Sequence, residues 1–193
     1  ADEALVVRPG TSPALALGLA GIVLREKLYD VDYVKTRTDL PLLVRLDTRK
    51  LLHASEVIPG YKNGELKNNT TILKQGEPPT APGKQGSQVI PEALRNEWGD
   101  FVVWDEKQNG PTAITRDEVG AKCKSAPALD GEFEVVIDEK KVKVATVFHL
   151  VRRYIDENFD LESTSQITWA PKEGMESLAR LIAANPGKTL ITV

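Results

Sequence analysis

One short stretch near the start of the chain constrains the fold more than any other. The apolar run 4–8 ends in a Pro-Gly turn, and a nearly all-apolar segment rich in small residues begins at Pro13. Thr11 or Ser12 can cap a helix there, because hydroxyl oxygens accept hydrogen bonds from the first turn of a helix, where proline is also favoured. The pattern predicts a strand, a tight loop and a helix over 13–27 whose small residues pack closely against a sheet.

This strand-loop-helix unit has two possible roles. Backbone N–H groups at a helix N-terminus attract phosphates and other polar groups, and open α/β sheets bind ligands at the carboxyl ends of their strands. Alternatively, the turn binds nothing and only redirects the chain. It matches neither the G-x-G-x-x-G nor the G-x-x-x-x-G-K-[ST] phosphate motif, so the residues alone leave both roles open.

Composition excludes several classes of protein. The 193 residues are 41% hydrophobic and 27% charged, which is ordinary for a globular chain with one substantial core. A net charge of −3 gives no general attraction to nucleic acid or anionic membranes, and no apolar run approaches the roughly 20 residues that span a bilayer. The single cysteine, Cys123, cannot alone hold an iron–sulfur cluster or a structural zinc ion. No catalytic or metal-ligand motif is present.

The rest of the chain combines helical and strand patterns around one irregular stretch. Prolines and glycines without sustained periodicity fill 59–100, which predicts a long loop that covers other domains or subunits. An Asn-Gly pair at 109–110 predicts a hairpin after a strand at 101–105, and a polar turn at 138–141 predicts a second hairpin. The other expected elements are a strand at 42–46, a final strand at 188–193, a short helix within 48–56, and helices at 31–37, 146–158, 161–169 and from Pro171 onward.

Together these elements predict an α/β fold. We expect part of an open, mostly parallel sheet with flanking helices, plus inserted antiparallel hairpins and a long irregular loop. Because the sequence opens and closes on strand patterns, we also expect an internal fragment of a longer chain. Its four expected parts are the strand-loop-helix side of the α/β domain at 1–58, the irregular excursion at 59–100, the hairpin insertion at 101–145, and the returning helices and strand at 146–193.

Several stretches together resemble one protein family. Residues 7–17 resemble the R-P-G-T-D-A-A-L-A-L segment of molybdopterin oxidoreductases, the DMSO reductase superfamily. Residues 28–34 and 38–45 are similar to the next stretches of the branch with respiratory nitrate reductase alpha subunits and nitrite oxidoreductases, and 101–105 and 147–193 also fit that branch. The order and spacing of these stretches carry the resemblance.

The resemblance implies a function for the parent protein. It would be the catalytic subunit of an oxidoreductase resembling nitrate reductase or nitrite oxidoreductase, with molybdenum held by two molybdopterin guanine dinucleotides. An iron–sulfur cluster and the metal ligand would lie outside this piece, so the isolated piece is expected to be inactive. The parent would pair with an iron–sulfur electron-transfer subunit, at the periplasmic or cytoplasmic face of a prokaryotic membrane complex. The alternative is a noncatalytic interaction or assembly domain, and the substrate stays open.

The resemblance also implies a site. The G-T-D turn of the family contacts the guanosine end of one dinucleotide, which implies cofactor binding by Arg8, Gly10, Thr11 and Ser12. Ser12 stands where the family has Asp, and an uncharged hydroxyl accepts fewer hydrogen bonds from guanine than a carboxylate does. Guanine recognition is then either weaker or supplied by a neighbour, and no residue of this chain is expected to be catalytic or to bind the metal.

Overall fold

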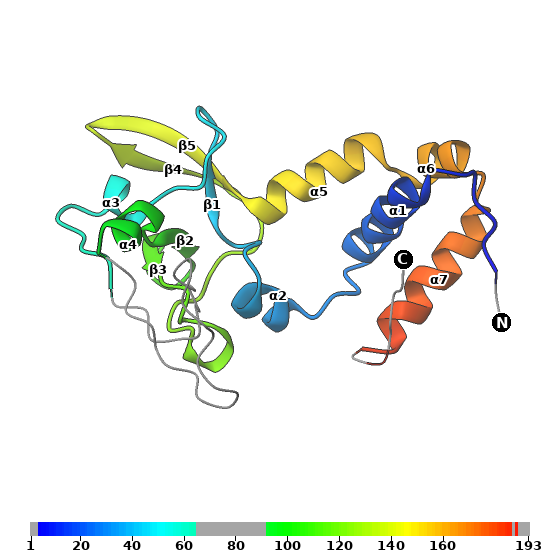
Figure 1. Cartoon of the computed structure of the whole chain (residues 1–193), viewed down its shortest axis with the longest axis horizontal. Helices are drawn as coiled ribbons and strands as arrows, with labels where there is room; N and C mark the ends of the chain where they lie inside the picture. Colours follow the sequence, from blue (N-terminus) through cyan, green and yellow to red (C-terminus); the bar gives the residue numbers. More distant parts are fainter. Residues whose placement is uncertain (1–3, 65–91, 187, 189–193) are drawn as a thin grey trace, which may run out of the picture. The chain divides into compact units, whose positions relative to one another are not determined.

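The computed structural model describes residues 4–64, 92–186 and 188 of the chain (Figure 1). The chain forms two compact units. The first combines 1–31 with 148–193, and the second holds 32–147. Within the described ranges, no helix is both long enough and apolar enough to cross a membrane.

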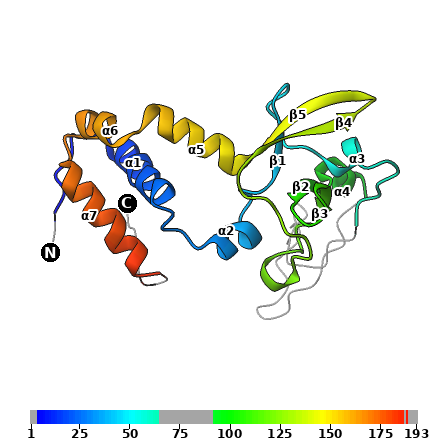
Figure 2. The same cartoon turned by 180° about the vertical axis from the view of Figure 1, so that it is seen from behind.

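The first unit is a helical bundle built on α1 (Ser12–Arg25). This helix packs against α6 (Leu161–Thr168) and α7 (Lys172–Ala184), and the two views show the three helices side by side (Figures 1 and 2). α1 starts as predicted, because Thr11 directly precedes its first turn and Pro13 lies within that turn. One hydrophobic core cluster consists of buried Ile22, Ala170, Met175 and Ala179, with half-buried Leu5, Val7, Leu15, Leu19, Val23 and Leu161 around it.

The small residues of α1 do pack closely, but their partners are helices and not the predicted sheet. A Cβ added to Gly18 would lie 2.7 Å from Oγ1 of Thr164 in α6. A Cβ added to Gly21 would lie 2.9 Å from Cγ2 of Ile155, in α5 (Val147–Asn158). Close approach of two helices needs small residues just as approach to a sheet does, so the sequence pattern cannot distinguish the two partners.

The predicted strand at 4–8 is not formed in the described structure. The side chains of this segment still alternate between buried and exposed, but the buried ones face helices. Leu5 and Val7 pack against the helical core, whereas Val6 is 83% exposed. The backbone N–H of Arg8 donates a 2.8 Å hydrogen bond to the carbonyl oxygen of Thr168, which ties the end of this segment to the end of α6. The predicted final strand at 188–193 lies outside the described residues, apart from Lys188.

The described residues of the second unit form two antiparallel sheets. β1 (Leu43–Arg45), β5 (Lys140–Thr146) and β4 (Glu132–Ile137) form one sheet in that order, with Leu43 opposite Thr146 and Glu132 opposite Ala145. β2 (Phe101–Asp105) pairs with β3 (Gly110–Ile114), with Phe101 opposite Ile114. Both predicted hairpins are therefore confirmed, and their turns place Asn109, Asp138 and Glu139 at φ values of 50°, 48° and 64°.

A mixed α/β fold is confirmed, but no parallel sheet is present among the described residues. The helix predicted within 48–56 forms only at α3 (Ala54–Val57). Before it, Arg49 adopts φ of 60° and the N–H of Arg45 bonds the carbonyl of Lys50, which closes a loop instead of a helical turn. The other helices that the structure describes in this unit are α2 (Val31–Arg37), α4 (Glu92–Trp98) and the 3-10 turn η1 (Gly120–Lys122).

The stretch predicted as irregular, 59–100, is described at its two ends only. α4 occupies its last part, and residues 65–91 lie outside the described structure. A buried ion pair joins Arg95 of α4 to Asp100, with 2.5 Å between Nη2 and Oδ1. Tyr61 donates a 2.8 Å hydrogen bond to the same carboxylate, and burial together with that carboxylate raises the pKa of Tyr61 to about 12. This cluster fixes the two ends of the stretch to each other.

Candidate functional site

The turn from Arg8 to Ser12 brings all four predicted site residues together. The Arg8 carbonyl accepts two hydrogen bonds from Thr11, at 3.2 Å from its N–H and 2.7 Å from its hydroxyl. Gly10 has φ of 81°, a conformation that glycine adopts without strain. No atom lies within 4 Å of a Cβ added to Gly10, so the space beside the turn is open. The backbone conformation, rather than crowding from this chain, requires the glycine.

The N-terminus of α1 keeps free hydrogen-bond donors beside this turn. Thr11 does not cap the helix as predicted, because its hydroxyl turns back to Arg8. Among the described residues, nothing accepts a hydrogen bond from the backbone N–H groups of Ser12 and Ala14, and the exposed Ser12 hydroxyl has no partner there either. Such donors at a helix N-terminus suit an anion or an acceptor-rich ligand.

An exposed tryptophan lies next to the same turn. Trp169 follows α6 in a left-handed conformation with φ of 66°, and its side chain is 67% exposed. The guanidinium carbon of Arg8 lies 5.5 Å from the centre of the Trp169 ring. The backbone N–H of Arg8 donates a hydrogen bond to the carbonyl oxygen of Thr168, the residue before Trp169. An exposed cation–π contact contributes about 0.5–1 kcal/mol, while left-handed backbone costs a non-glycine residue roughly 1–2 kcal/mol.

Sequence reasoning missed Trp169 as a site residue. The available signal was a bulky side chain at the last position of the predicted helix 161–169, where helices commonly end in glycine. The turn, the open donors and the indole together form a surface that can hold a planar ligand with hydrogen-bond acceptors. Whether Arg8, Gly10, Thr11 and Ser12 bind a cofactor stays a prediction.

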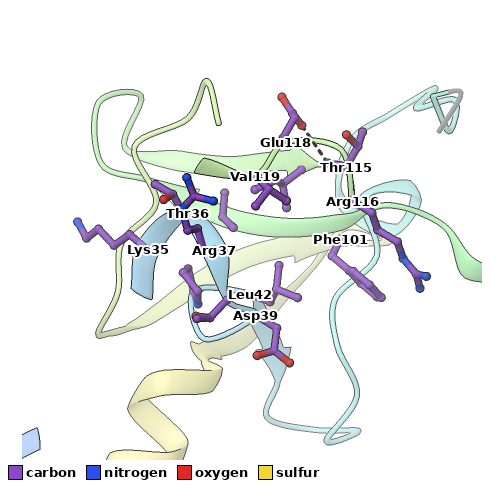
Figure 3. A pocket seen from close by; sticks show the side chains of 14 residues that line it. Lys35, Thr36, Arg37, Asp39, Leu42, Phe101, Thr115, Arg116, Glu118 and Val119 are labelled. Carbon is purple, nitrogen blue, oxygen red and sulfur yellow. Dashed lines mark hydrogen bonds between the residues drawn. The ribbon is translucent and has the colours of Figure 1, made fainter. Parts of the chain in front are cut away.

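The second unit holds a separate cleft of about 280 Å³, which contains none of the predicted site residues (Figure 3). Its apolar lining includes Leu42, Phe101, Val103, Ile114 and Val119. The polar groups at its edge are largely engaged within the unit. Lys35 pairs with Glu106 at 2.8 Å, and the Arg116 guanidinium lies over the Trp98 ring at 4.9 Å from its centre.

Other groups in this cleft also serve the local fold. Glu118 accepts a 2.9 Å hydrogen bond from the Thr115 N–H, and the Arg37 guanidinium lies where a side chain on Gly120 would be. The described parts of the chain contain no group of three or more His, Cys, Asp or Glu residues placed to hold a metal ion. Asp39 also lines the cleft, and its exposed carboxylate accepts no hydrogen bond from the described residues.

Comparison with curated proteins identifies relatives over nearly the whole chain, although no protein-family model matches it. The chain is 30% identical over 187 residues to perchlorate reductase subunit alpha of Dechloromonas aromatica, covering 93% of this chain and 18% of the relative. It is 32% identical over 185 residues to respiratory nitrate reductase subunit alpha of Haloferax mediterranei, covering 94% and 16%. With chlorate reductase subunit alpha of Ideonella dechloratans, it is 28% identical over 188 residues, covering 94% and 16%. The chain thus spans less than a fifth of the length of these relatives.

Proposed function

This chain belongs to the molybdopterin oxidoreductase family, as a segment related to its catalytic alpha subunits, and we propose that it helps to hold a molybdopterin guanine dinucleotide. The parent protein is then an oxidoreductase of the perchlorate, chlorate or nitrate reductase type. A separate noncatalytic assembly domain is not favoured, because the matches to alpha subunits cover 93–94% of the chain.

The residues of the Arg8–Ser12 turn fit a nucleotide. The phosphates and the guanine O6 and N7 atoms of such a ligand are acceptors, and the unpartnered N–H groups of Ser12 and Ala14 are donors. Arg8 adds a positive charge that pairs with no carboxylate in the described residues, and the Ser12 hydroxyl can both donate and accept. Gly10 leaves open space beside these groups, which a side chain at this position would fill.

This arrangement indicates which tasks belong to the cofactor and which belong to the residues of this chain. When bound, the molybdenum cofactor supplies the redox chemistry of the parent enzyme. The residues of this chain bind and orient its nucleotide end, because they offer backbone donors and a cation rather than metal ligands. The proposed iron–sulfur cluster and the electron-transfer subunit would draw on other parts of the parent protein, since this chain has one cysteine.

One observation carries the proposal: a glycine-dependent turn leaves two backbone N–H groups of α1 unpartnered beside open space, within the part of the chain that the structure describes. The test is the guanine nucleotide content of the complete alpha subunit after Gly10→Val. Gly60→Val is the matched control, because Gly60 also has positive φ, at 70°, and open space around its Cβ position. A loss confined to Gly10→Val supports the proposal, and equal content in both variants contradicts it.

A further inference from the structure

The fold of the first unit does not account for the side chain of Trp169. The residue is 67% exposed, so its indole gains little from burial, and its left-handed backbone at φ of 66° is one that glycine would adopt at lower cost. Nothing in the described residues accepts a hydrogen bond from its indole N–H. The ring does meet the Arg8 guanidinium, but the attraction between them does not exceed the cost of the backbone.

The indole is nevertheless carried on a rigid support. The N–H of Trp169 donates a 2.8 Å hydrogen bond to the carbonyl of Ser165, and the N–H of Ala170 donates to the hydroxyl of Thr168 at 3.2 Å. Ser165 returns a 2.8 Å hydrogen bond from its hydroxyl to the Ala170 carbonyl. Thr168 and Ala170 are fully buried on either side. The backbone therefore holds the ring beside the Arg8–Ser12 turn.

We propose that Trp169 and Arg8 form a stacking platform for the guanine base of the dinucleotide, an inference that rests on the proposed function of the neighbouring turn. Aromatic side chains and arginine planes both stack on nucleobases, and arginine also donates to the O6 and N7 acceptors of guanine. A planar base with acceptor atoms satisfies the indole, the guanidinium and the free N–H groups of Ser12 and Ala14 together. An apolar protein segment would cover the ring but leave these donors unpaired.

The platform also supplies what Ser12 lacks. Ser12 offers guanine only an uncharged hydroxyl, which accepts fewer hydrogen bonds than a carboxylate would. Stacking on Trp169 retains the base without requiring a charge at Ser12. Trp169 is thus a positioning residue for the nucleotide end of the cofactor and takes no part in the redox step.

The test uses two substitutions of similar size in the complete, cofactor-loaded alpha subunit. Trp169→Phe keeps an aromatic face, whereas Trp169→Leu keeps apolar bulk but cannot stack, and both keep the left-handed backbone strain. The measurement is the rate at which guanine nucleotide leaves the folded subunit well below its Tm. We expect Trp169→Leu to lose nucleotide about tenfold faster than the natural protein and Trp169→Phe to lose it no more than about threefold faster.

A third substitution separates stacking from a structural role. Trp169→Gly relieves the backbone strain, so the platform account predicts an unchanged or raised Tm together with faster nucleotide loss. Glu139→Gly is its control, because Glu139 has φ of 64° in the β4–β5 turn and is exposed. The rate of nucleotide loss from Glu139→Gly should equal that of the natural protein.

Two outcomes would overturn the platform. If Trp169→Leu and Trp169→Phe release nucleotide at the same rate, the ring does not stack on the base. If Trp169→Gly lowers Tm and leaves nucleotide retention intact, another part of the protein covers the indole. In either case, an effect of Gly10→Val on nucleotide content would leave the proposed function standing, whereas absence of that effect would remove both.

Discussion

Gly18 of α1 lies directly against the side chain of Thr164 in α6, and there is no room between them for a methyl group on residue 18. A Cβ on Gly18 would lie 2.7 Å from Oγ1 and 2.9 Å from Cβ of Thr164. Thr164 is fully buried, and its hydroxyl has no hydrogen-bond partner among the described residues. The helix that follows the candidate site is therefore positioned by a contact that only glycine allows.

This contact predicts that Gly18→Ala destabilises the chain by about 1–3 kcal/mol, because the added methyl overpacks a buried helix contact. Gly174→Ala in α7 is the control. Its Cβ would meet Cδ2 of Leu5 at 2.5 Å, but that atom is the end of a flexible side chain, and alanine gains about 1 kcal/mol in helix propensity. Thermal and urea unfolding measure both effects. Equal stability changes in the two variants would contradict the account, and Thr164→Ala should partly rescue Gly18→Ala.

The sequence predicted elements better than it predicted their partners. The helix that begins near Pro13 and the hairpin turn at Asn109 follow from local chemistry, because proline at a first helical turn and Asn-Gly in a hairpin each favour one backbone geometry. Gly18 predicted close packing correctly, but not the helix against which it packs. Residues 4–8 have a strand pattern and form no strand in the described structure, because a strand also needs a partner with free hydrogen-bonding groups.

The candidate site was predictable only in part. A turn at Gly10 is a local property, so sequence reasoning could place it and its neighbours together. Trp169 comes next to Arg8 only through tertiary packing, since the two residues lie far apart along the chain. Its left-handed backbone also contradicts the usual preference for glycine at such a helix end, so propensity alone gives no reason to expect it there.

The buried pair of Arg95 and Asp100 predicts a large effect of removing one charge. Their side chains are only 8% and 1% exposed, so Asp100→Asn leaves an uncompensated guanidinium in the interior, at a cost of about 3–5 kcal/mol. Asp47→Asn is the control, because the carboxylate paired with Arg45 is 49% exposed and water replaces the lost partner. Urea unfolding compares the two variants. A small effect of Asp100→Asn would refute a structural role for the pair.

The lowered pKa of Asp105 should make the free energy of unfolding depend on pH. Burial opposes ionisation, but hydrogen bonds from the N–H groups of Lys107, Gln108 and Ala126 outweigh it and hold the pKa of Asp105 below its ordinary value. The resulting stabilisation is full above the unfolded pKa of about 3.9 and is lost as the pH falls toward the lower folded pKa.

Asp105→Asn should therefore reduce the free energy of unfolding at pH 7, and its deficit against the natural chain should shrink below about pH 4. Chemical denaturation between pH 7 and pH 3 measures this difference. Asp39→Asn serves as the control, because the exposed Asp39 side chain accepts no hydrogen bond within the described residues. A deficit that stays constant over the whole pH range would show that ionisation of Asp105 is not responsible.

An acidic side chain at position 12 is expected to strengthen the binding of guanine by the turn. A carboxylate accepts two N–H bonds from guanine, and hydrogen bonds to charged groups contribute about 1.5–3 kcal/mol. We expect Ser12→Asp in the complete alpha subunit to retain guanine nucleotide as well as the natural protein or better. Ser12→Asn lacks the charge and should give no gain. Faster nucleotide loss from Ser12→Asp than from Ser12→Asn would argue against guanine at this position.

The most direct test of whether the turn at Gly10 holds the cofactor uses the complete alpha subunit. It compares the cofactor content of Gly10→Val with that of Gly60→Val. The two glycines have similar positive φ values of 81° and 70° and similarly open surroundings, so valine strains the backbone alike and lowers Tm in both. Molybdenum and guanine nucleotide are measured per folded subunit. We predict a loss of both from Gly10→Val and full content in Gly60→Val; full content in a destabilised Gly10→Val protein would contradict the account and leave the turn with a structural role alone.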